Sequence, residues 1–291
     1  MKKYREKMIG KVKVIFDDGI VKLYSDGGTL RKTWLEAAGI DRQDVRSIFV
    51  DGGEVKLPKD SCGGEMFGYY LFGGLCNLQT MYLSGFDTSN VTNMRGMFVD
   101  CSDIRKLDFS CFQTPNVTDM SNMFYDCRNL TELNLGNFDT SNVTDMAHMF
   151  DGCQSLKKIN LRSFDTSNVT NMSEMFAQCS SLRPIDLSSF NTSSVTDMNG
   201  MFCNCAGLIN LDVSGFDTSK VTDMSSMFQS CRRLVTLDLS KFDVSRVTDM
   251  TWMFKNCERL IRLIMSPAAR EDARTTDIFK NCPYNMEILY Q

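Results

Sequence analysis

The sequence predicts an α/β repeat solenoid, specifically a leucine-rich repeat array with parallel strands on one face and short helices on the other. Two observations support this. Residues of one type return every 26 positions without an insertion, and each unit combines a helix-period stripe with a strand-period stretch. A unit of this size buries its apolar side only against its neighbours, so one elongated body is expected. The register is clearest in the cysteine row, Cys101, Cys127, Cys153, Cys179, Cys205, Cys231 and Cys257.

The first part of each unit has the pattern of a short helix. Met146, Met149, Phe150 and Cys153 are spaced i, i+3, i+4 and i+7, which places them on one helical stripe. The dipeptide Thr144-Asp145 directly before them predicts an N-cap, because both side chains can accept hydrogen bonds from the first N–H groups of a helix.

The second part of each unit has the pattern of a short strand. Residues 156–164 place Leu156, Ile159, Leu161 and Phe164 at the inward positions of a leucine-rich stretch with period two. The strands of successive units are therefore expected to pair in parallel, and the array is expected to be a curved rod.

Residues 1–59 lack the repeat, and we expect them to form an N-terminal ββαββ cap. Alternating residues on either side of Asp17-Asp18-Gly19 predict a hairpin over 11–24. Helix formers over 29–38 end at glycine, and residues 46–57 predict a second hairpin. The terminal units of a solenoid must cover its open apolar end. The chain therefore divides into a cap domain at 1–59, a solenoid at 60–265, and a degenerate repeat with a C-terminal cap at 266–291.

The composition is that of a globular chain with no polyanion partner. The 291 residues are 43% hydrophobic and 23% charged with a net charge of −4, so the basic excess of a nucleic-acid-binding protein is missing. No apolar run reaches the roughly 18 residues that a membrane-spanning helix needs, and we expect no membrane insertion. No signal peptide is evident in the first residues, which leaves a cytoplasmic location open.

No catalytic residues, metal site or cofactor are predicted. The chain has one histidine, His148, on the outward side of the expected helix, where other units carry Asn122, Glu174 or Ser226. It is therefore interpreted as an ordinary surface residue. The cysteines are spaced as a linear ladder and not as the clustered ligands of a zinc site, and we expect them to be free, buried thiols. Cys203 lies on an outward row and is expected to react first.

The outward strand positions are the candidate binding residues, because packing does not determine them. One row varies in charge, whereas the next row is almost uniformly Asp or Asn. Strand-lined concave faces are common binding surfaces in solenoids. The candidates are Lys106, Asp108, Glu132, Asn134, Lys158, Asn160, Asp186, Asp212, Asp238 and Arg262.

The signature F-D-T-S-N-V-T-D-M-x-x-M-F-x-x-C-x-x-L-x-x-L-x-L, complete from Phe138 to Leu161, resembles the 26-residue repeat of the BspA-like leucine-rich repeat family. The resemblance covers residues 60–282. It implies a leucine-rich repeat fold and a role in binding or adhesion at a bacterial surface.

Two functions stay open. The first is a non-catalytic, adhesin-like protein that recognises a protein or a surface glycan through the strand-lined face. The second is an intracellular structural scaffold in which the N-terminal domain is the binding module. The sequence does not determine the oligomeric state.

Overall fold

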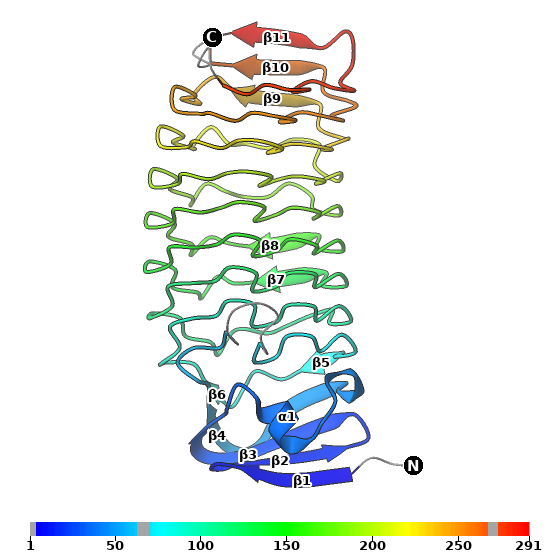
Figure 1. Ribbon diagram of the computed structural model, residues 1–291, viewed down its shortest axis with the longest axis vertical. Helices are drawn as coiled ribbons and strands as arrows, with labels where there is room; N and C mark the ends of the chain where they lie inside the picture. Colours follow the sequence, from blue (N-terminus) through cyan, green and yellow to red (C-terminus); the bar gives the residue numbers. More distant parts are fainter. Residues whose placement is uncertain (1–3, 63–69, 267–272, 291) are drawn as a thin grey trace.

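The computed structural model describes residues 4–62, 70–266 and 273–290. They form a β-solenoid of about ten turns, which we call rungs, stacked along the long axis of the molecule (Figure 1). The strands and helices are β1 (Tyr4–Ile9), β2 (Val12–Asp17), β3 (Ile20–Thr29), α1 (Trp34–Ala38), the 3₁₀ helix η1 (Arg42–Asp44), β4 (Ser47–Lys56), β5 (Thr80–Met81), β6 (Phe86–Asp87), β7 (Glu132–Asn134), β8 (Lys158–Asn160), β9 (Thr236–Leu239), β10 (Arg262–Met265) and β11 (Glu287–Tyr290).

The N-terminal segment differs from the expected ββαββ order. Strands β1, β2 and β3 form an antiparallel meander, and β4 then pairs in parallel with β3. The expected second hairpin is wrong, because Asp51-Gly52-Gly53 does not turn the chain and β4 continues through it as one strand with a register shift. Helix α1 has five residues and ends at Gly39 in the left-handed conformation. No helix in the described part of the chain has the length and apolar character needed to cross a bilayer.

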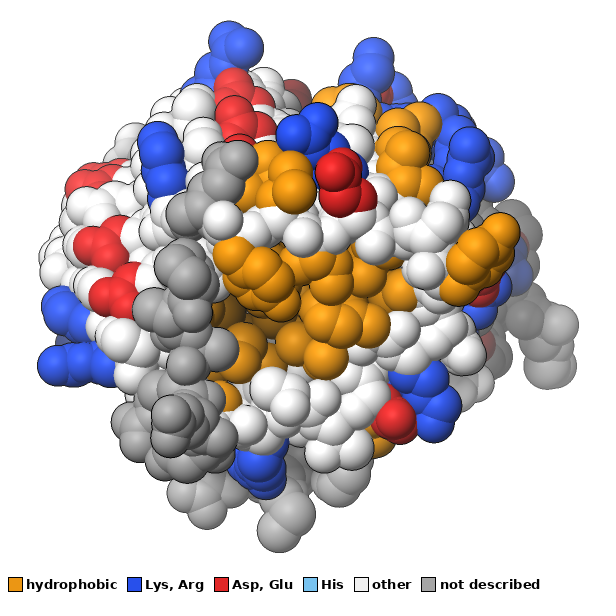
Figure 2. Space-filling view, turned by 90° about the horizontal axis from the view of Figure 1, so that it is seen from above, with side chains coloured by type: hydrophobic (Ala, Val, Ile, Leu, Met, Phe, Trp, Pro, Cys, Tyr) orange, Lys and Arg blue, Asp and Glu red, His pale blue; other side chains and the backbone are white. Residues whose placement is uncertain are grey.

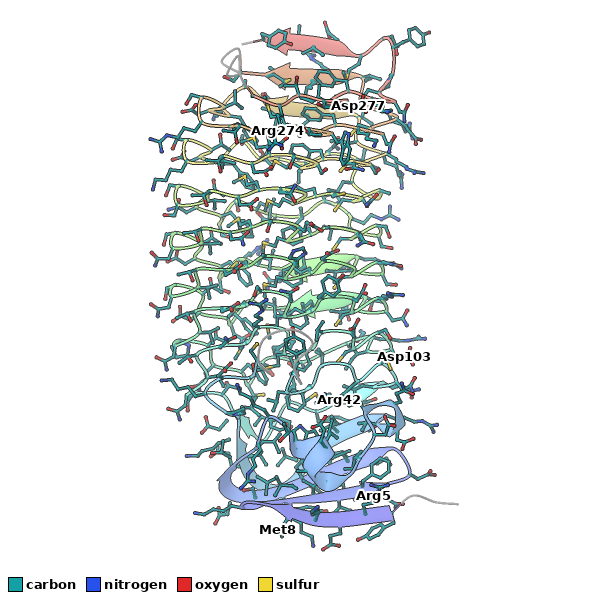
Figure 3. All side chains as sticks on the ribbon, viewed as in Figure 1. Arg5, Met8, Arg42, Asp103, Arg274 and Asp277 are labelled. Atoms are coloured by element: carbon teal, nitrogen blue, oxygen red, sulfur yellow. The ribbon has the colours of Figure 1, made fainter. Side chains whose placement is uncertain are left out.

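The N-terminal sheet is continuous with the first rungs. Strand β4 pairs in parallel with β5 and also with β6. The buried Trp34 side chain donates from Nε1 to the carbonyl of Leu71 at 3.1 Å, and the Arg42 guanidinium donates to the carbonyl of Gly73 (Figure 3). The segment thus packs on the first rung as a cap would. The domain boundaries given above stay predictions.

The strand side of the solenoid is parallel, as expected. Strand β7 pairs in register with β8, and β10 pairs with both β9 and β11. Between these two groups the rungs of Pro184 and Asn210 form no strand. Proline has no N–H to donate to a neighbouring strand, which accounts for the interruption at the rung of Pro184 but not for the one at Asn210.

The expected short helices are wrong: the described rungs carry a run of tight turns in their place. In one unit, the N–H groups of Met146, His148 and Phe150 donate to carbonyls of the next rung at 2.8–3.1 Å. The alternate N–H groups of Met149 and Cys153 bond three residues back along the chain. An α-helix would instead require bonds four residues back at each of these positions. Met146, Met149, Phe150 and Cys153 are all buried in this run of turns, as they would be on one stripe of a helix. The apolar spacing is therefore compatible with both structures.

The polar residues before these turns keep part of their expected role. Asp145 Oδ1 accepts the N–H of Ala147 at 2.9 Å, as a capping carboxylate would. Thr144 does not cap, because its hydroxyl donates to the carbonyl of Thr118 on the preceding rung at 3.2 Å. The exposed threonine row therefore joins neighbouring rungs.

Hydrogen bonds join the rungs on both sides of the stack, so the expected bending toward the strand side has no cause here, and the rungs follow one another along the long axis (Figure 1). Helices about 10 Å wide on one side and strands ~4.8 Å apart on the other would force an array to bend. Here backbone hydrogen bonds join successive rungs on the turn side as well as on the strand side. Both sides therefore advance by about the same distance per rung, and the strand side is not concave.

The core consists of parallel rows of identical side chains. The phenylalanines that follow the second methionine of each unit stack face to face, with Phe150 lying 5.7 Å from Phe124 and 5.4 Å from Phe176 between ring centroids. Beside them, each cysteine of the ladder donates its thiol to a phenylalanine carbonyl of the preceding rung, as Cys153 does to Phe124 at 3.2 Å. All twelve cysteines are free. The prediction of a reduced, buried ladder is confirmed for the seven cysteines of the row.

Thiol titration should separate this ladder from the other cysteines. Burial raises the pKa of the Cys101 and Cys257 thiols to about 12 and that of Cys203 to about 11, so at pH 8 these thiols stay protonated and slow to react. Cys203 is half-buried, whereas Cys111 is exposed. We therefore expect Cys111 to react first, which corrects the expectation for Cys203. Most thiols should react with Ellman's reagent only after denaturation. Peptide mapping that finds Cys203 or Cys153 labelled before Cys111 would contradict this order.

The C-terminal rung leaves part of the core open. Figure 2 looks onto this end and shows apolar side chains gathered at its centre. Ile278, Phe279 and Met286 are only partly buried here. In the same rung, Arg274 lies beside Asp249 of the preceding rung, with 2.7 Å between its Nη2 and Asp249 Oδ2 (Figure 3). Residues 267–272 of the expected C-terminal segment lie outside the described residues.

Candidate functional site

The ten predicted residues share one side of the solenoid, which we call the strand face. Nine of them are exposed and Asn160 is half-buried. Cross-strand pairs place Glu132 beside Lys158, and Asp108 beside Asn134, on adjacent rungs. The rows therefore run along the long axis as expected, on a flat face instead of a concave one.

The near-uniform Asp/Asn row has a local structural cause. Asp186 Oδ1 accepts the N–H of Ser188 at 3.1 Å and its hydroxyl at 2.6 Å, and Asp212 and Asp238 each bond the N–H two residues on at 2.9 Å. This contact fixes the bend at the end of the strand, as Asx turns do. These positions are therefore not as free as was expected, because the turn holds one oxygen of each carboxylate.

The second oxygen of these aspartates is still available at the surface. The hydrogen bonds from serine lower the pKa of Asp186, Asp212 and Asp238, so all three are ionised at neutral pH. Arg162 Nε lies 3.7 Å from Asp186 Oδ2, and both side chains are more than half exposed. The pair is therefore weak and open to exchange. The result is a row of three negative charges on an exposed face.

Cations and a shallow hollow lie on the same face. Lys106 is ion-paired with Glu132, and Arg262 Nε lies 3.9 Å from Glu287 Oε2. A hollow of about 310 Å³ is lined by Glu132, Leu133, Asn134, Lys158, Ile159 and Asn160. A larger groove of about 670 Å³ lies away from this face, at residues that include Asp100, Asp103 and Arg128. Both hollows are open, so neither has the enclosure of a small-molecule site.

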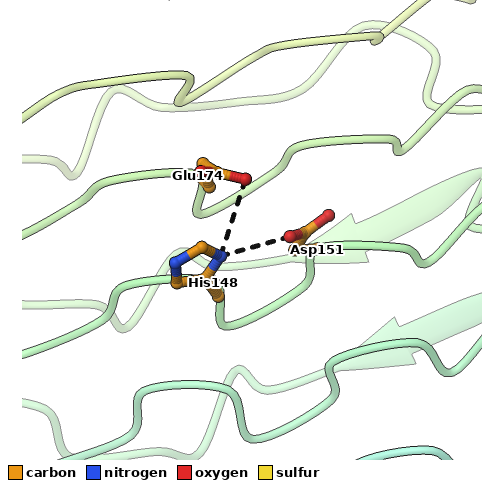
Figure 4. Close-up of side chains that lie close together, drawn as sticks. All are labelled: His148, Asp151 and Glu174. Atoms are coloured by element: carbon orange, nitrogen blue, oxygen red, sulfur yellow. Dashed lines mark hydrogen bonds and ion pairs between the residues drawn. The ribbon is translucent and has the colours of Figure 1, made fainter.

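The turn side holds a group of polar residues that the sequence analysis missed. His148 and Glu174 occupy the same position on adjacent rungs, both with positive φ, and Asp151 lies three residues after His148 (Figure 4). His148 Nδ1 is 3.1 Å from Asp151 Oδ2 and 3.7 Å from Glu174 Oε2. We call these three residues the His148 cluster.

The His148 cluster is more than a surface ion pair. The Asp151 side chain is 3% exposed and that of His148 is 33% exposed, so the histidine is not the ordinary surface residue that was expected. The hydrogen bond to Asp151 is the main cause that raises the pKa of His148. Burial raises the pKa of Glu174. Spacing alone could not indicate this cluster, because its members are ordinary turn-side positions that only the stacking of rungs brings together.

The stacked 26-residue rungs and the exposed strand face define the class of the protein, which is a solenoid of the leucine-rich repeat type. The chain belongs to the family described as "Mycoplasma protein of unknown function, DUF285", which matches residues 69–156, 118–214 and 183–288, more than half of the sequence. The matched residues are those that carry the 26-residue signature, and the resemblance to the BspA-like leucine-rich repeat family is confirmed. No curated protein matches the sequence.

The solved structures that are similar to the chain include two leucine-rich repeat proteins. A leucine rich cell surface protein from Faecalibacterium prausnitzii A2-165 is 15% identical with a TM-score of 0.34, covering 98% of this chain and 94% of that chain. A leucine-rich repeat protein from Eubacterium ventriosum ATCC 27560 is 13% identical with a TM-score of 0.35, covering 98% and 99%. Neither likeness is close enough to transfer a site or a partner to this chain.

Proposed function

We propose that this chain is a non-catalytic binding protein of a bacterial surface and that its strand face contacts a partner. The observation that carries the proposal is the row of Asp186, Asp212 and Asp238 on successive rungs. Each is exposed and ionised, and the Oδ1 of each accepts the backbone N–H two residues on, which fixes the side chain. Rung spacing of ~4.8 Å puts the three charges along one line. A side chain fixed by the backbone loses little entropy when it binds, which favours a preorganised contact.

A protein with a basic surface fits this face better than a glycan. An open, charged, flat surface suits electrostatic pairing with lysine and arginine side chains. A glycan site would be expected to enclose more of its ligand in a pocket. Adhesion is one use of such a contact.

The test is a comparative capture experiment on the full chain. Asp186→Asn, Asp212→Asn and Asp238→Asn together remove three charges but keep the Oδ1 acceptor of each turn. We expect partners that the native chain captures to be lost or reduced at least about tenfold, the change that ~1.4 kcal/mol gives, and the remaining binding to weaken as salt is added.

The chain offers a matched control. Asp165, Asp217 and Asp243 hold the same kind of turn, with Oδ1 accepting the N–H two residues on, but they belong to the turn after the phenylalanine and not to the strand face. Replacing these three by asparagine changes the net charge equally and should leave capture unchanged. Equal loss from both triple variants would mean that only net charge matters and would sink the proposal. If a captured partner stays bound when salt is added but is released by a soluble glycan, the strand face binds a glycan and not a basic protein.

A second candidate is the scaffold in which the N-terminal segment binds. It is favoured by β1, an outer strand whose Tyr4 and Met8 side chains are 60% and 58% exposed. Deleting residues 1–59 is a poor test, because β4 supplies hydrogen bonds to β5 and β6. Tyr4→Lys with Met8→Lys is better. Capture that fails in this variant and persists in the triple aspartate variant would favour the scaffold.

A further inference from the structure

We propose that His148, Asp151 and Glu174 form a binding site for a divalent transition-metal ion of the zinc type. One imidazole nitrogen and two carboxylate oxygens, His148 Nδ1, Asp151 Oδ2 and Glu174 Oε2, face one another (Figure 4). All three ligand atoms lie within 4.8 Å of one another. These are the ligand types that zinc accepts in proteins.

The two distances from His148 Nδ1 to the carboxylate oxygens are close to those between ligands of a tetrahedral ion. With metal–ligand bonds of about 2.0–2.1 Å, two ligands of a tetrahedral zinc ion are ~3.3 Å apart. The measured separations from His148 Nδ1 are 3.1 Å to Asp151 Oδ2 and 3.7 Å to Glu174 Oε2. The third pair, Asp151 Oδ2 and Glu174 Oε2, lies within 4.8 Å, so binding an ion would draw these two carboxylates closer together. Calcium is a poor fit, because it takes six to eight oxygen ligands at longer distances.

The surroundings hold these groups in the required orientation. Gln178 Nε2 donates to Asp151 Oδ1 at 3.1 Å, which leaves Oδ2 directed at His148. Outer hydrogen bonds of this kind orient the ligands of metal sites. The rung after Glu174 carries Gly200, where a Cβ atom would stand 2.8 Å from Glu174 Cγ. The absence of a side chain at Gly200 therefore leaves room for the Glu174 side chain.

Charge also favours a cation at this place. Asp151 is 2% exposed, so its carboxylate is cut off from the water that would screen it. Glu174 brings a second carboxylate to the same nitrogen. A dication with a neutral imidazole compensates both carboxylates, whereas a protonated imidazole compensates only one. The partly exposed side chains of His148 and Glu174 leave a route for the ion and for a water molecule as fourth ligand.

The experiment uses the full chain without a histidine tag, with Co²⁺ as a spectroscopic probe and Zn²⁺ as competitor. We expect one Co²⁺ per chain, with visible absorption of a tetrahedral site, and displacement by Zn²⁺ but not by Ca²⁺ or Mg²⁺. His148 is the single histidine, so its imidazole NMR signals can be followed without assignment. They should shift when Zn²⁺ is added.

Three variants test the ligands, and Gln178→Met and Glu258→Gln serve for comparison. His148→Asn is tolerated by the backbone, because Asn122 occupies the same position with φ of 58°. Asp151→Asn and Glu174→Gln keep the size of each side chain. Each should weaken Co²⁺ binding by more than the about 10–100-fold expected for Gln178→Met, which removes only the outer hydrogen bond. Glu258→Gln, at an exposed ion pair with Arg232, is the charge-matched control and should bind as the native chain does.

Three results would overturn the site. The first is absence of saturable binding by the native chain. The second is equal weakening in Glu258→Gln, which would indicate loose binding to surface carboxylates. The third is native imidazole signals that stay in place while metal binds. This last measurement needs no variant, so it decides the matter even if a substitution unfolds the chain.

Discussion

Replacing Phe150 by alanine is expected to lower the free energy of unfolding by about 3–5 kcal/mol. The ring is fully buried and stacks on Phe124 on one side and on Phe176 on the other, with interplanar angles of 4° and 14°. Its loss opens a cavity and removes two aromatic contacts, each contributing about 0.5–1.5 kcal/mol beyond burial. Urea unfolding followed by circular dichroism measures the change.

A phenylalanine at the end of the same row provides the control for Phe150→Ala. Phe279 belongs to the same row, but it is only partly buried, and among the described residues it stacks on one ring, that of Phe254, at 5.5 Å. In a solenoid each rung is stabilised by its neighbours, so a defect in a middle rung weakens two interfaces and one at the end weakens a single interface. Phe279→Ala should therefore cost clearly less than Phe150→Ala. Equal losses of unfolding free energy in the two variants would mean that contacts between neighbouring rungs do not determine the stability of each rung.

The repeat, the inward rows and the free cysteines could be predicted because they depend only on spacing. The helix could not be separated from a run of turns, since the inward spacing of Met146, Met149, Phe150 and Cys153 fits both structures. A second signal was present. Two outward positions per unit have positive φ, and one of them carries residues that favour the left-handed region. This row is Asp100, Asp126, Gly152, Gln178, Asn204, Ser230, Asn256 and Asn281.

The site was predicted less completely than the fold. The position of the strand face follows from the period-two pattern, and its exposure agrees with the structure. The turn-forming role of Asp186 and Asp212 depends on the backbone bend after the strand, which spacing does not describe. The His148 cluster depends on which residues the 26-residue translation places above one another. Glu174 follows His148 by one rung, a relation that is visible in the sequence once the rows are compared across units.

Replacing Thr166 by valine is expected to be the second most damaging change, although it alters the shape of the side chain very little. The buried Thr166 hydroxyl donates to the carbonyl of Asn191 on the next rung at 2.8 Å and accepts the N–H of the same residue at 2.8 Å. Valine fits this position sterically, since Val244 occupies it three rungs later and is buried. Valine would leave both backbone groups of Asn191 unpaired, at a cost of about 1–3 kcal/mol for each. Thr166→Ser keeps the hydroxyl and should cost only about 0.8 kcal/mol for the lost methyl group.

Urea unfolding gives both free energies, and amide hydrogen exchange at Asn191 should accelerate in Thr166→Val alone. A valine variant as stable as the serine variant would show that water or a relaxed backbone satisfies Asn191 and that this threonine row does not tie the rungs together.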